Sequence, residues 1–250
     1  MKKLLSISLL TVLTLGTLTA CGNTSTTTTN ELGLIEDGKI YAATNPTYAP
    51  FEYMDGTEMV GFDIDLLNEV AELAGLEVVY TALDFDLIIP AVQSGQYDLG
   101  MSGISVTEER KELILFGDAY YSSAQVALLP KASAITSVDE LKDGILGAGL
   151  GTTGESVAET LSTDLTLVDT DVALPMLNAG QLDAYICDLG VAQNAVATGN
   201  YIMLEEKIQS EEMSMVFEKE NEALAAELNK HLATFMETDE YQALLEKYGL

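Results

Sequence analysis

The chain contains a single arginine, Arg110, which ends the segment Ser102–Arg110; its other strong cations are all lysines. The planar guanidinium presents five donors and can grip a carboxylate through two parallel hydrogen bonds. A lone arginine after a run of small residues therefore indicates a carboxylate-binding site. The alternative is a composition bias that left one arginine on the surface, and rarity alone does not decide between the two.

Three further segments carry groups that complement Arg110. The turn Gly151–Gly154 lies between an expected strand and an expected helix. Its backbone N–H groups, including that of Thr153, should therefore face an anion. Asp188 offers a negative group for a cation, and Ser105 offers a hydroxyl. Together they suit a zwitterion, with its carboxylate on Arg110 and its ammonium on Asp188. Alternatively, the turn is only a tight connection and Asp188 is one of 40 mostly solvated acids.

The residue pattern gives little support for catalysis. His231 is the only histidine, in a helical stretch over 224–236, where we expect a surface or packing role. No nucleophile–base pair, no metal-type spacing of His and Cys and no phosphate-binding loop is visible in the sequence. We therefore expect no catalytic residue, no metal and no cofactor.

An internal repeat predicts how these residues are positioned. Residues 84–98 align without gaps on residues 169–183, with six of 15 positions identical. Each copy has Asp at a helix N-cap position, a short apolar helix and Gly at the helix end. Each also has Pro in about the first helical turn, where the missing N–H costs little. With the apolar strands that follow, over 99–102 and 184–187, the repeat predicts two β-α-β units.

Strands and helices alternate elsewhere too, which favours α/β lobes with parallel sheets. Ser137 and Glu140 form a capping-box pattern, typical of a helix start. Ligands bind outside the carboxyl ends of parallel strands, so Ser102–Gly103 and Cys187–Asp188 should face each other across a cleft. The other expected elements are strands over 40–43, 77–81 and 145–150 and helices over 63–74, ended by Gly75, and 154–161.

The N-terminus has the layout of a secretory signal peptide over residues 1–20, with Lys2 and Lys3 before an apolar run. Leu18-Thr-Ala-Cys21 resembles the bacterial lipobox, which implies that Cys21 becomes a lipidated N-terminus carrying fatty acyl chains such as palmitate. The alternative is an ordinary signal with a coincidental cysteine. The polar residues that follow, up to about 37, are expected to form a flexible tether.

Removal of residues 1–20 leaves nine cations against 40 acids. Such a surface repels nucleic acid and anionic membranes, so neither is an expected partner, and it favours a soluble monomer. Without Cys21 the only thiol is Cys187, so stability must come from a hydrophobic core. Because nothing else in the sequence is long and apolar enough to span a bilayer, we expect attachment to the membrane by lipid alone.

Several separate motifs, in order from about residue 39 to 250, resemble the extracytoplasmic solute-binding proteins of polar amino-acid ABC transporters, family 3. The resemblance implies a type II periplasmic-binding-protein clamshell: α/β, two lobes, each a sheet flanked by helices, with two crossings near 122–128 and 213–217. Its implied limits are 1–20 for the signal peptide, 21–37 for the lipidated cysteine and tether, 38–126 with 214–250 for lobe 1, and 127–213 for lobe 2. The motifs are residues 44–52, 60–66, 84–91, 102–110, 151–154 and 183–188.

The resemblance also assigns ligand-binding roles. Arg110, with the backbone at Ser105 and Thr153, would bind the α-carboxylate of an amino acid. Asp188, the Gly103 carbonyl and Ser105 would bind its α-ammonium. The remaining residues of the implied site are the aromatic walls Tyr48 and Phe85, which could equally be core aromatics, together with Asn45 and Ser102.

Two departures from the family pattern bear on specificity. Asn45 stands where binders of basic amino acids tend to have Asp, and Gly149 stands where other members have a larger residue, which could leave extra room. These features favour a neutral polar amino acid as ligand.

The implied function is delivery of that amino acid to an ABC importer permease. The protein would act outside the cytoplasm, lipid-anchored at the outer face of the cytoplasmic membrane or in the periplasm. Two rival functions are an enzyme on the same scaffold, similar to periplasmic dehydratases, and a lipoprotein that presents its ligand to a sensor.

Overall fold

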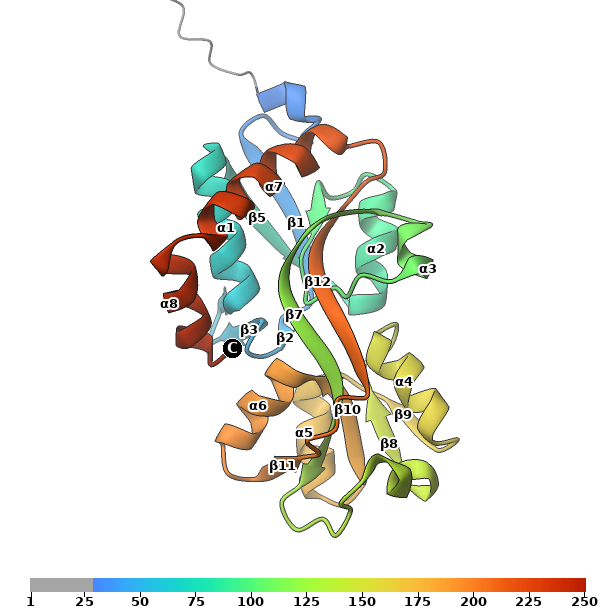
Figure 1. The fold of residues 1–250 in the computed structure, drawn as a ribbon. Coiled ribbons are helices and arrows are strands. Elements are labelled where there is room, and N and C mark those ends of the chain that lie inside the picture. The colour runs from blue at the N-terminus through green and yellow to red at the C-terminus, as the bar shows by residue number, and fades with distance from the viewer. Residues whose placement is uncertain (1–28) are drawn as a thin grey trace, which may run out of the picture.

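The structure is a computed structural model that describes residues 29–250, folded into two lobes (Figure 1). The predicted signal peptide and Cys21 lie outside these residues. Part of the expected tether packs on lobe 1 instead: a short 3-10 helix, η1 (Thr29–Leu32), is followed by buried Leu34, and the Ile35 N–H donates to Asp98. The buried Leu34 side chain and the backbone hydrogen bond of Ile35 explain why this part of the segment folds onto the lobe.

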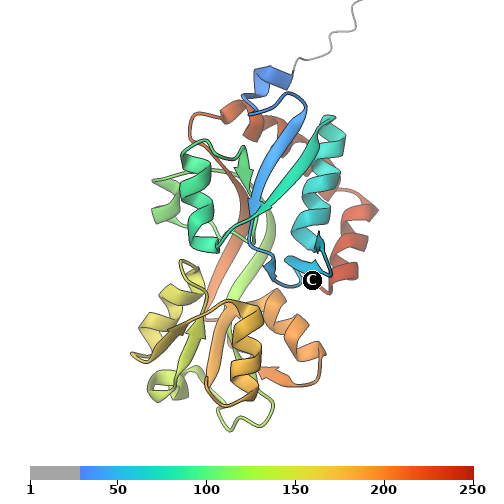
Figure 2. The same cartoon turned by 180° about the vertical axis from the view of Figure 1, so that it is seen from behind.

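Lobe 1 is a sheet with helices on both faces, as Figures 1 and 2 show from opposite sides. Its strand order is β5-β1-β6-β12-β7, and β1 pairs in parallel with both β5 and β6. Its strands are β1 (Lys39–Thr44), β5 (Glu77–Ala82), β6 (Leu99–Gly100) and parts of β7 (Leu115–Pro130) and β12 (Gln209–Phe217). Its helices are α1 (Phe62–Ala74), α2 (Phe85–Gln93), α3 (Glu108–Lys111), α7 (Glu222–Met236) and α8 (Asp239–Tyr248).

Lobe 2 repeats this plan at smaller size. Strand β10 pairs in parallel with β8, and β8 with β9, while β11 adds to the end of β7. Its strands are β8 (Leu146–Ala148), β9 (Leu165–Leu167), β10 (Ala184–Asp188) and β11 (Tyr201–Met203). Its helices are η2 (Val138–Asp143), α4 (Thr153–Leu161), α5 (Thr170–Asn178) and α6 (Leu189–Ala197).

The two antiparallel strands β7 and β12 connect the lobes (Figure 1). Because β7 pairs with β12 along one half and with β10 along the other, the two expected sheets form one hydrogen-bonded path. Val216 and Phe217 pair with β6, so the part of β12 that reaches toward lobe 2 is its first half, slightly earlier than the expected crossing at 213–217. The residue limits of the lobes remain a prediction.

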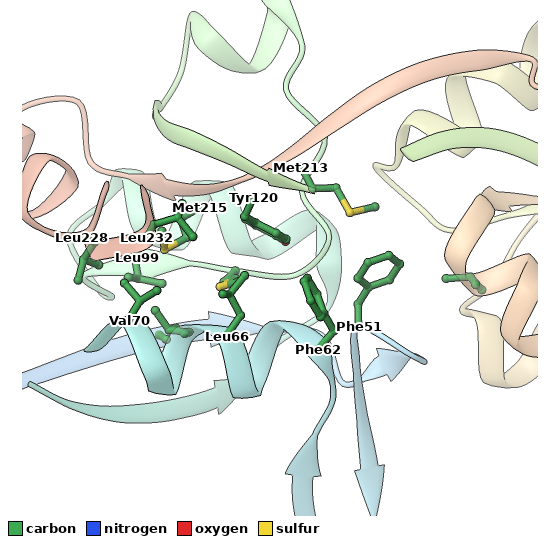
Figure 3. Close-up of a cluster of buried hydrophobic side chains, with 14 of the residues drawn as sticks. Phe51, Phe62, Leu66, Val70, Leu99, Tyr120, Met213, Met215, Leu228 and Leu232 are labelled. Carbon is green, nitrogen blue, oxygen red and sulfur yellow. The ribbon is translucent and has the colours of Figure 1, made fainter. Parts of the chain in front are cut away.

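A separate three-stranded sheet, β2 (Thr47–Tyr48), β3 (Glu52–Asp55) and β4 (Glu58–Val60), lies between β1 and α1 in the chain. The core of lobe 1 packs beside it. Figure 3 shows side chains of α1, β6, β7, β12 and α7 pointing toward one another, among them Phe62, Tyr120 and Leu228. Removing this apolar surface from water is the main favourable term in folding.

The repeat is confirmed as two β-α-β units. Gly95 and Gly180 follow their helices with φ of 70° and 67°, the left-handed conformation that glycine adopts without strain. Helix α1 likewise ends at Gly75 with φ of 74°. Asp84 and Asp169 occupy the N-cap positions, although neither side chain makes a capping hydrogen bond.

Two local predictions were wrong. Pro90 and Pro175 lie inside α2 and α5, past the first turn, so each removes a helical hydrogen bond. The capping box at Ser137 is absent, because the Glu140 carboxylate accepts from Thr136 instead and the segment forms a 3-10 helix.

Among residues 29–250, no helix is long and apolar enough to cross a bilayer. Cys187 is a buried free thiol. His231 lies on α7, where its Nε2 atom is 2.9 Å from Glu227 Oε1, and it does not line the cavity between the lobes.

Candidate ligand-binding site

A cavity lies where the two lobes meet, with about 490 Å³ of space including its opening to solvent. Eight of the nine predicted ligand residues line it, and the ninth, Ser102, is buried directly behind it. The lining residues of lobe 1 are Asn45, Thr47, Tyr48, Glu52, Phe85, Gly103, Ser105 and Arg110; those of β7 and lobe 2 are Gln125, Gly149, Thr152, Thr153, Asp169, Thr170, Tyr185, Ile186 and Asp188.

Arg110 is held rigidly at one end of the cavity. Its side chain is 9% exposed and stacks over the Phe85 ring at 5.4 Å. Nη1 donates to the Ser105 carbonyl at 2.7 Å, and Nη2 donates to the Gly151 carbonyl of lobe 2 at 2.9 Å. These two bonds use part of the donor set, and no carboxylate of the described residues forms an ion pair with it. The guanidinium therefore keeps donors and an unneutralised charge for a ligand.

The charge of Arg110 is costly in this position without an anion. Burial lowers the pKa of Arg110, and the nearby carboxylate of Glu211 acts in the opposite direction. Across the cleft, Thr153 begins α4, so its N–H has no acceptor within its own helix. This N–H is a candidate second donor for an anion, and that role of the Gly151–Gly154 turn stays a prediction.

Glu211 is a site residue that the sequence did not reveal. It lies on β12, and its Oε2 accepts from the hydroxyls of Ser105, in a short contact, and of Thr153 at 2.8 Å. The Gln125 amide, on β7, donates to the same oxygen at 3.4 Å. Glu211 therefore ties one residue of each lobe to the connecting strands. No local sequence signal marks it, because its place depends on the pairing of β12 with β7.

Asp188 provides an anion at another part of the cavity wall. It is 4% exposed, and its Oδ2 accepts from the Tyr48 hydroxyl at 2.6 Å. The other oxygen, Oδ1, is buried and makes no hydrogen bond of normal geometry, although the side chains of Ser123 and Gln125 act on the carboxyl group to lower its pKa. Burial, together with the charge of Glu211, raises the pKa of Asp188 to about 7. An unpaired buried carboxylate oxygen is unfavourable, so the site is suited to a cationic group.

The far end of the cavity carries a second acid that the sequence analysis did not assign to the site. Asp169, at the N-cap of α5, lines the cavity and hydrogen-bonds with Asn45. Burial raises its pKa, and so do the charges of Asp171, Asp84 and Asp86. The repeat could have flagged this residue, since it brings the helix N-termini of both lobes to the cleft.

Three neutral residues of the cavity wall were singled out in the sequence. Tyr48 and Phe85, which could have been core aromatics, both line the cavity. Gly149 also lines the cavity, and a Cβ there would lie 2.9 Å from the Thr152 Cγ2 atom. The glycine therefore makes room for Thr152, and extra room for a ligand stays a prediction.

Comparisons with known proteins show which family the chain resembles. The model of the bacterial extracellular solute-binding proteins, family 3, matches residues 40–250. A probable histidine-binding protein of Neisseria gonorrhoeae is 32% identical over 223 residues, covering 84% of this chain and 83% of that protein. The arginine-binding extracellular protein ArtP of Bacillus subtilis is 30% identical over 240 residues, covering 92% of each.

The solved structures include an ancestral arginine-binding protein bound to arginine. Its TM-score with this chain is 0.79 at 31% identity, covering 84% of this chain and 98% of that one. This likeness confirms the expected two-lobed, type II α/β fold. The chain belongs to the bacterial extracellular solute-binding proteins, family 3.

Proposed function

We propose that the protein binds a free amino acid between its lobes, with the α-carboxylate on Arg110 and the α-ammonium on Asp188. One observation carries the proposal: the same cavity contains a guanidinium without an ion pair and a buried Oδ1 without a donor. A zwitterion supplies one partner to each and removes the cost of two unpaired buried groups. The N–H groups of Ser105 and Thr153 complete the carboxylate end.

The ligand side chain extends toward Asn45 and Asp169. The amide at Asn45 alone favours a neutral polar side chain, but Asp169 restores a carboxylate at this end of the cavity. Relatives named for binding arginine and histidine support the same choice. We therefore propose a cationic amino acid, arginine first, as the ligand.

A neutral polar amino acid such as glutamine remains a second candidate. Its basis is that Asn45 already hydrogen-bonds with Asp169 and accepts from Thr47 at 2.7 Å, which offsets part of the acidity of this end. A side-chain amide could join that network with both its donor and its acceptor.

Binding serves delivery to an ABC importer permease rather than catalysis. The two lobes meet through strands that can act as a hinge, so a ligand held by both lobes favours the closed form. The protein would act as a monomer outside the cytoplasm, attached through lipidated Cys21. Family membership supports this role over the dehydratase-like and sensor-presenting alternatives.

Calorimetric titration of the purified protein, freed of co-purified ligand, against the twenty amino acids tests the proposal. We expect binding of arginine and of few other amino acids. Binding of glutamine or asparagine, but of no cationic amino acid, would select the second candidate. Absence of binding across the panel would contradict amino-acid recognition altogether. Uptake of labelled arginine by cells with and without the gene then tests delivery.

A further inference from the structure

Two carboxyl groups lie buried side by side in lobe 1, against the cavity. Glu52, on β3, is 0% exposed and lines the cavity, and Asp63, on α1, is 1% exposed. Neither forms an ion pair with any cation of the described residues. Two ionised carboxylates in such a position would repel each other at short range in a low dielectric. The pair therefore needs a proton.

The hydrogen bonds account for all four oxygens if one proton is shared. Asp63 Oδ2 accepts from the Gly103 N–H at 2.8 Å and from the Tyr120 hydroxyl at 2.7 Å. Glu52 Oε1 accepts from the Ser102 hydroxyl at 2.8 Å. The remaining oxygens, Glu52 Oε2 and Asp63 Oδ1, are buried with no other donor, and the two carboxyl groups hydrogen-bond to each other. A single acid proton between them satisfies both.

The donor count indicates which residue carries the proton. Asp63 receives two donors besides its partner and Glu52 receives one, and donors to a carboxylate stabilise its charged form. Burial raises the pKa of Glu52 well above its ordinary value and that of Asp63 only to about 6. At neutral pH the pair thus holds a neutral Glu52 and a charged Asp63.

The partners of the pair belong to the ligand cavity. Gly103 has φ of 54°, in the left-handed region, and lines the cavity. The Ser102 hydroxyl, which donates to Glu52, accepts from the Asn45 N–H at 3.0 Å. The pair therefore fixes the backbone segment 102–103 and, through the Ser102 hydroxyl, the backbone at Asn45.

We propose that Glu52 and Asp63 are positioning residues for ligand binding: a carboxylic acid–carboxylate pair that shares one proton, holds Ser102–Gly103 against the cavity and keeps one negative charge behind the ligand's α-ammonium. The link to the ammonium rests on the proposed function. Among the described elements around the pair, the other titratable or charged groups are Asp188 on β10, Tyr48 on β2, Tyr80 on β5, Tyr120 and Tyr121 on β7, and, from α8, Tyr241, Tyr248 and the Asp65-bound Lys247.

Two isosteric substitutions separate the roles of the pair. In Glu52→Gln the amide NH2 replaces the acid proton and the amide oxygen still accepts from Ser102, so arginine affinity should fall less than in Asp63→Asn. In Asp63→Asn the charge is lost, and affinity should fall about tenfold or more. Asp65→Asn, on the exposed side of the same helix, is the matched control and should leave affinity unchanged. Equal effects at Glu52 and Asp63, or the reverse order, would overturn the assignment.

If Asp63→Asn does not fold, Glu52→Ala takes its place. It removes the acid proton and leaves the Asp63 charge without its donor, so affinity should fall about tenfold, and by more than in Glu52→Gln. Equal losses of affinity in the two Glu52 variants would instead indicate that the glutamate is charged, and would contradict the shared proton.

Infrared spectroscopy of the ligand-free protein tests the proton independently of any ligand. At about pH 8, above the pKa of about 7 of Asp188, wild type should show the carbonyl band of a protonated carboxyl and Glu52→Gln should lack it. Absence of the band from wild type, or its persistence in Glu52→Gln, would overturn the shared proton. If the band behaves as expected but no amino acid binds, the proposed function fails and only the link to the ligand falls with it.

Discussion

In the first copy of the repeat the last aspartate, Asp98, is 4% exposed, whereas its counterpart Asp183 is exposed. Both form the same pair of bonds with a neighbouring segment of the lobe: Asp98 with Tyr41 on β1, and Asp183 with Ile145 directly before β8, each through its own N–H and its carboxylate. Asp98 also accepts from the Ile35 N–H, because the N-terminal segment covers it. The unit is thus the same in both lobes, but the burial of its last aspartate determines how much that aspartate contributes to the free energy of unfolding.

The other ends of the two copies differ in chemistry. In lobe 1 the strand leads to the neutral pair Ser102–Gly103 and the starting acid Asp84 is exposed. In lobe 2 the strand ends in Asp188, and the starting acid Asp169 lines the cavity. The comparison shows how one β-α-β unit can provide backbone groups in one lobe and carboxylates in the other.

The largest effect should come from removing either of the two charges that we propose contact the ligand. We expect Arg110→Ala and Asp188→Asn each to lose about 2–5 kcal/mol of binding free energy, because each leaves the opposite ligand charge buried without a partner. Calorimetry with arginine measures this, with Lys111→Ala as control beside Arg110. Unchanged affinity in either variant would remove that residue from the site and end the contrast between the lobes.

The next comparison tests the aspartates that end the two copies. Asp98→Asn should lower the free energy of unfolding by about 1.5–3 kcal/mol, since a buried charged acceptor of two N–H groups is weakened. Asp183→Asn, exposed and with one such bond, should cost about 0.5–1 kcal/mol. Urea denaturation of both variants gives the difference. Equal losses would show that the N-terminal segment adds nothing to the first copy.

The pH dependence should report Asp188. Its ligand-free pKa of about 7 means that binding of an ammonium requires loss of a proton below that pH, so the association constant should fall about tenfold per pH unit below 7. The raised pKa has the opposite sign for folding: the stability that the neutral carboxyl contributes is lost as pH rises from about 4 to about 7. Asp188→Asn should abolish both trends, and their persistence in that variant would place the titration elsewhere.

The smallest effect concerns the acids that start the two copies. Asp169→Asn should weaken arginine binding about fivefold, since a half-buried carboxylate interacts with the ligand cation through partial screening. Asp84→Asn, its exposed counterpart, should have no effect on affinity. A gain in glutamine affinity in Asp169→Asn would sharpen the assignment of Asp169 to the side-chain end. Equal behaviour of the two variants would contradict it.

Local patterns predicted the elements that local physics controls. The glycine stops at Gly75, Gly95 and Gly180 and the amphipathic helix α1 follow from conformational preference and periodicity. The prolines at 90 and 175 were misplaced because lobe packing tolerates a helix that lacks one hydrogen bond. Local preference determines where an element forms, but tertiary contacts determine whether that element can contain an unfavourable residue such as proline.

The site was only partly predictable for the same reason. The single arginine, the turn at 151–154 and the repeat indicated Arg110, Thr153 and Asp188. Glu211 and Asp63 reach the site through the pairing of β12 with β7 and the packing of α1 on β3, over long sequence separations. Asp63 lies within the motif at 60–66, but a motif in one sequence does not reveal which distant residues its side chains contact.

The most direct test of the central claim compares arginine with agmatine, which lacks the α-carboxylate, and δ-guanidinovalerate, which lacks the α-ammonium. Wild type should bind arginine at least about 30-fold more tightly than either analogue. Arg110→Ala should no longer distinguish arginine from agmatine, and Asp188→Asn should no longer distinguish arginine from δ-guanidinovalerate. If agmatine binds wild type as tightly as arginine, Arg110 does not hold a ligand carboxylate and the account is wrong.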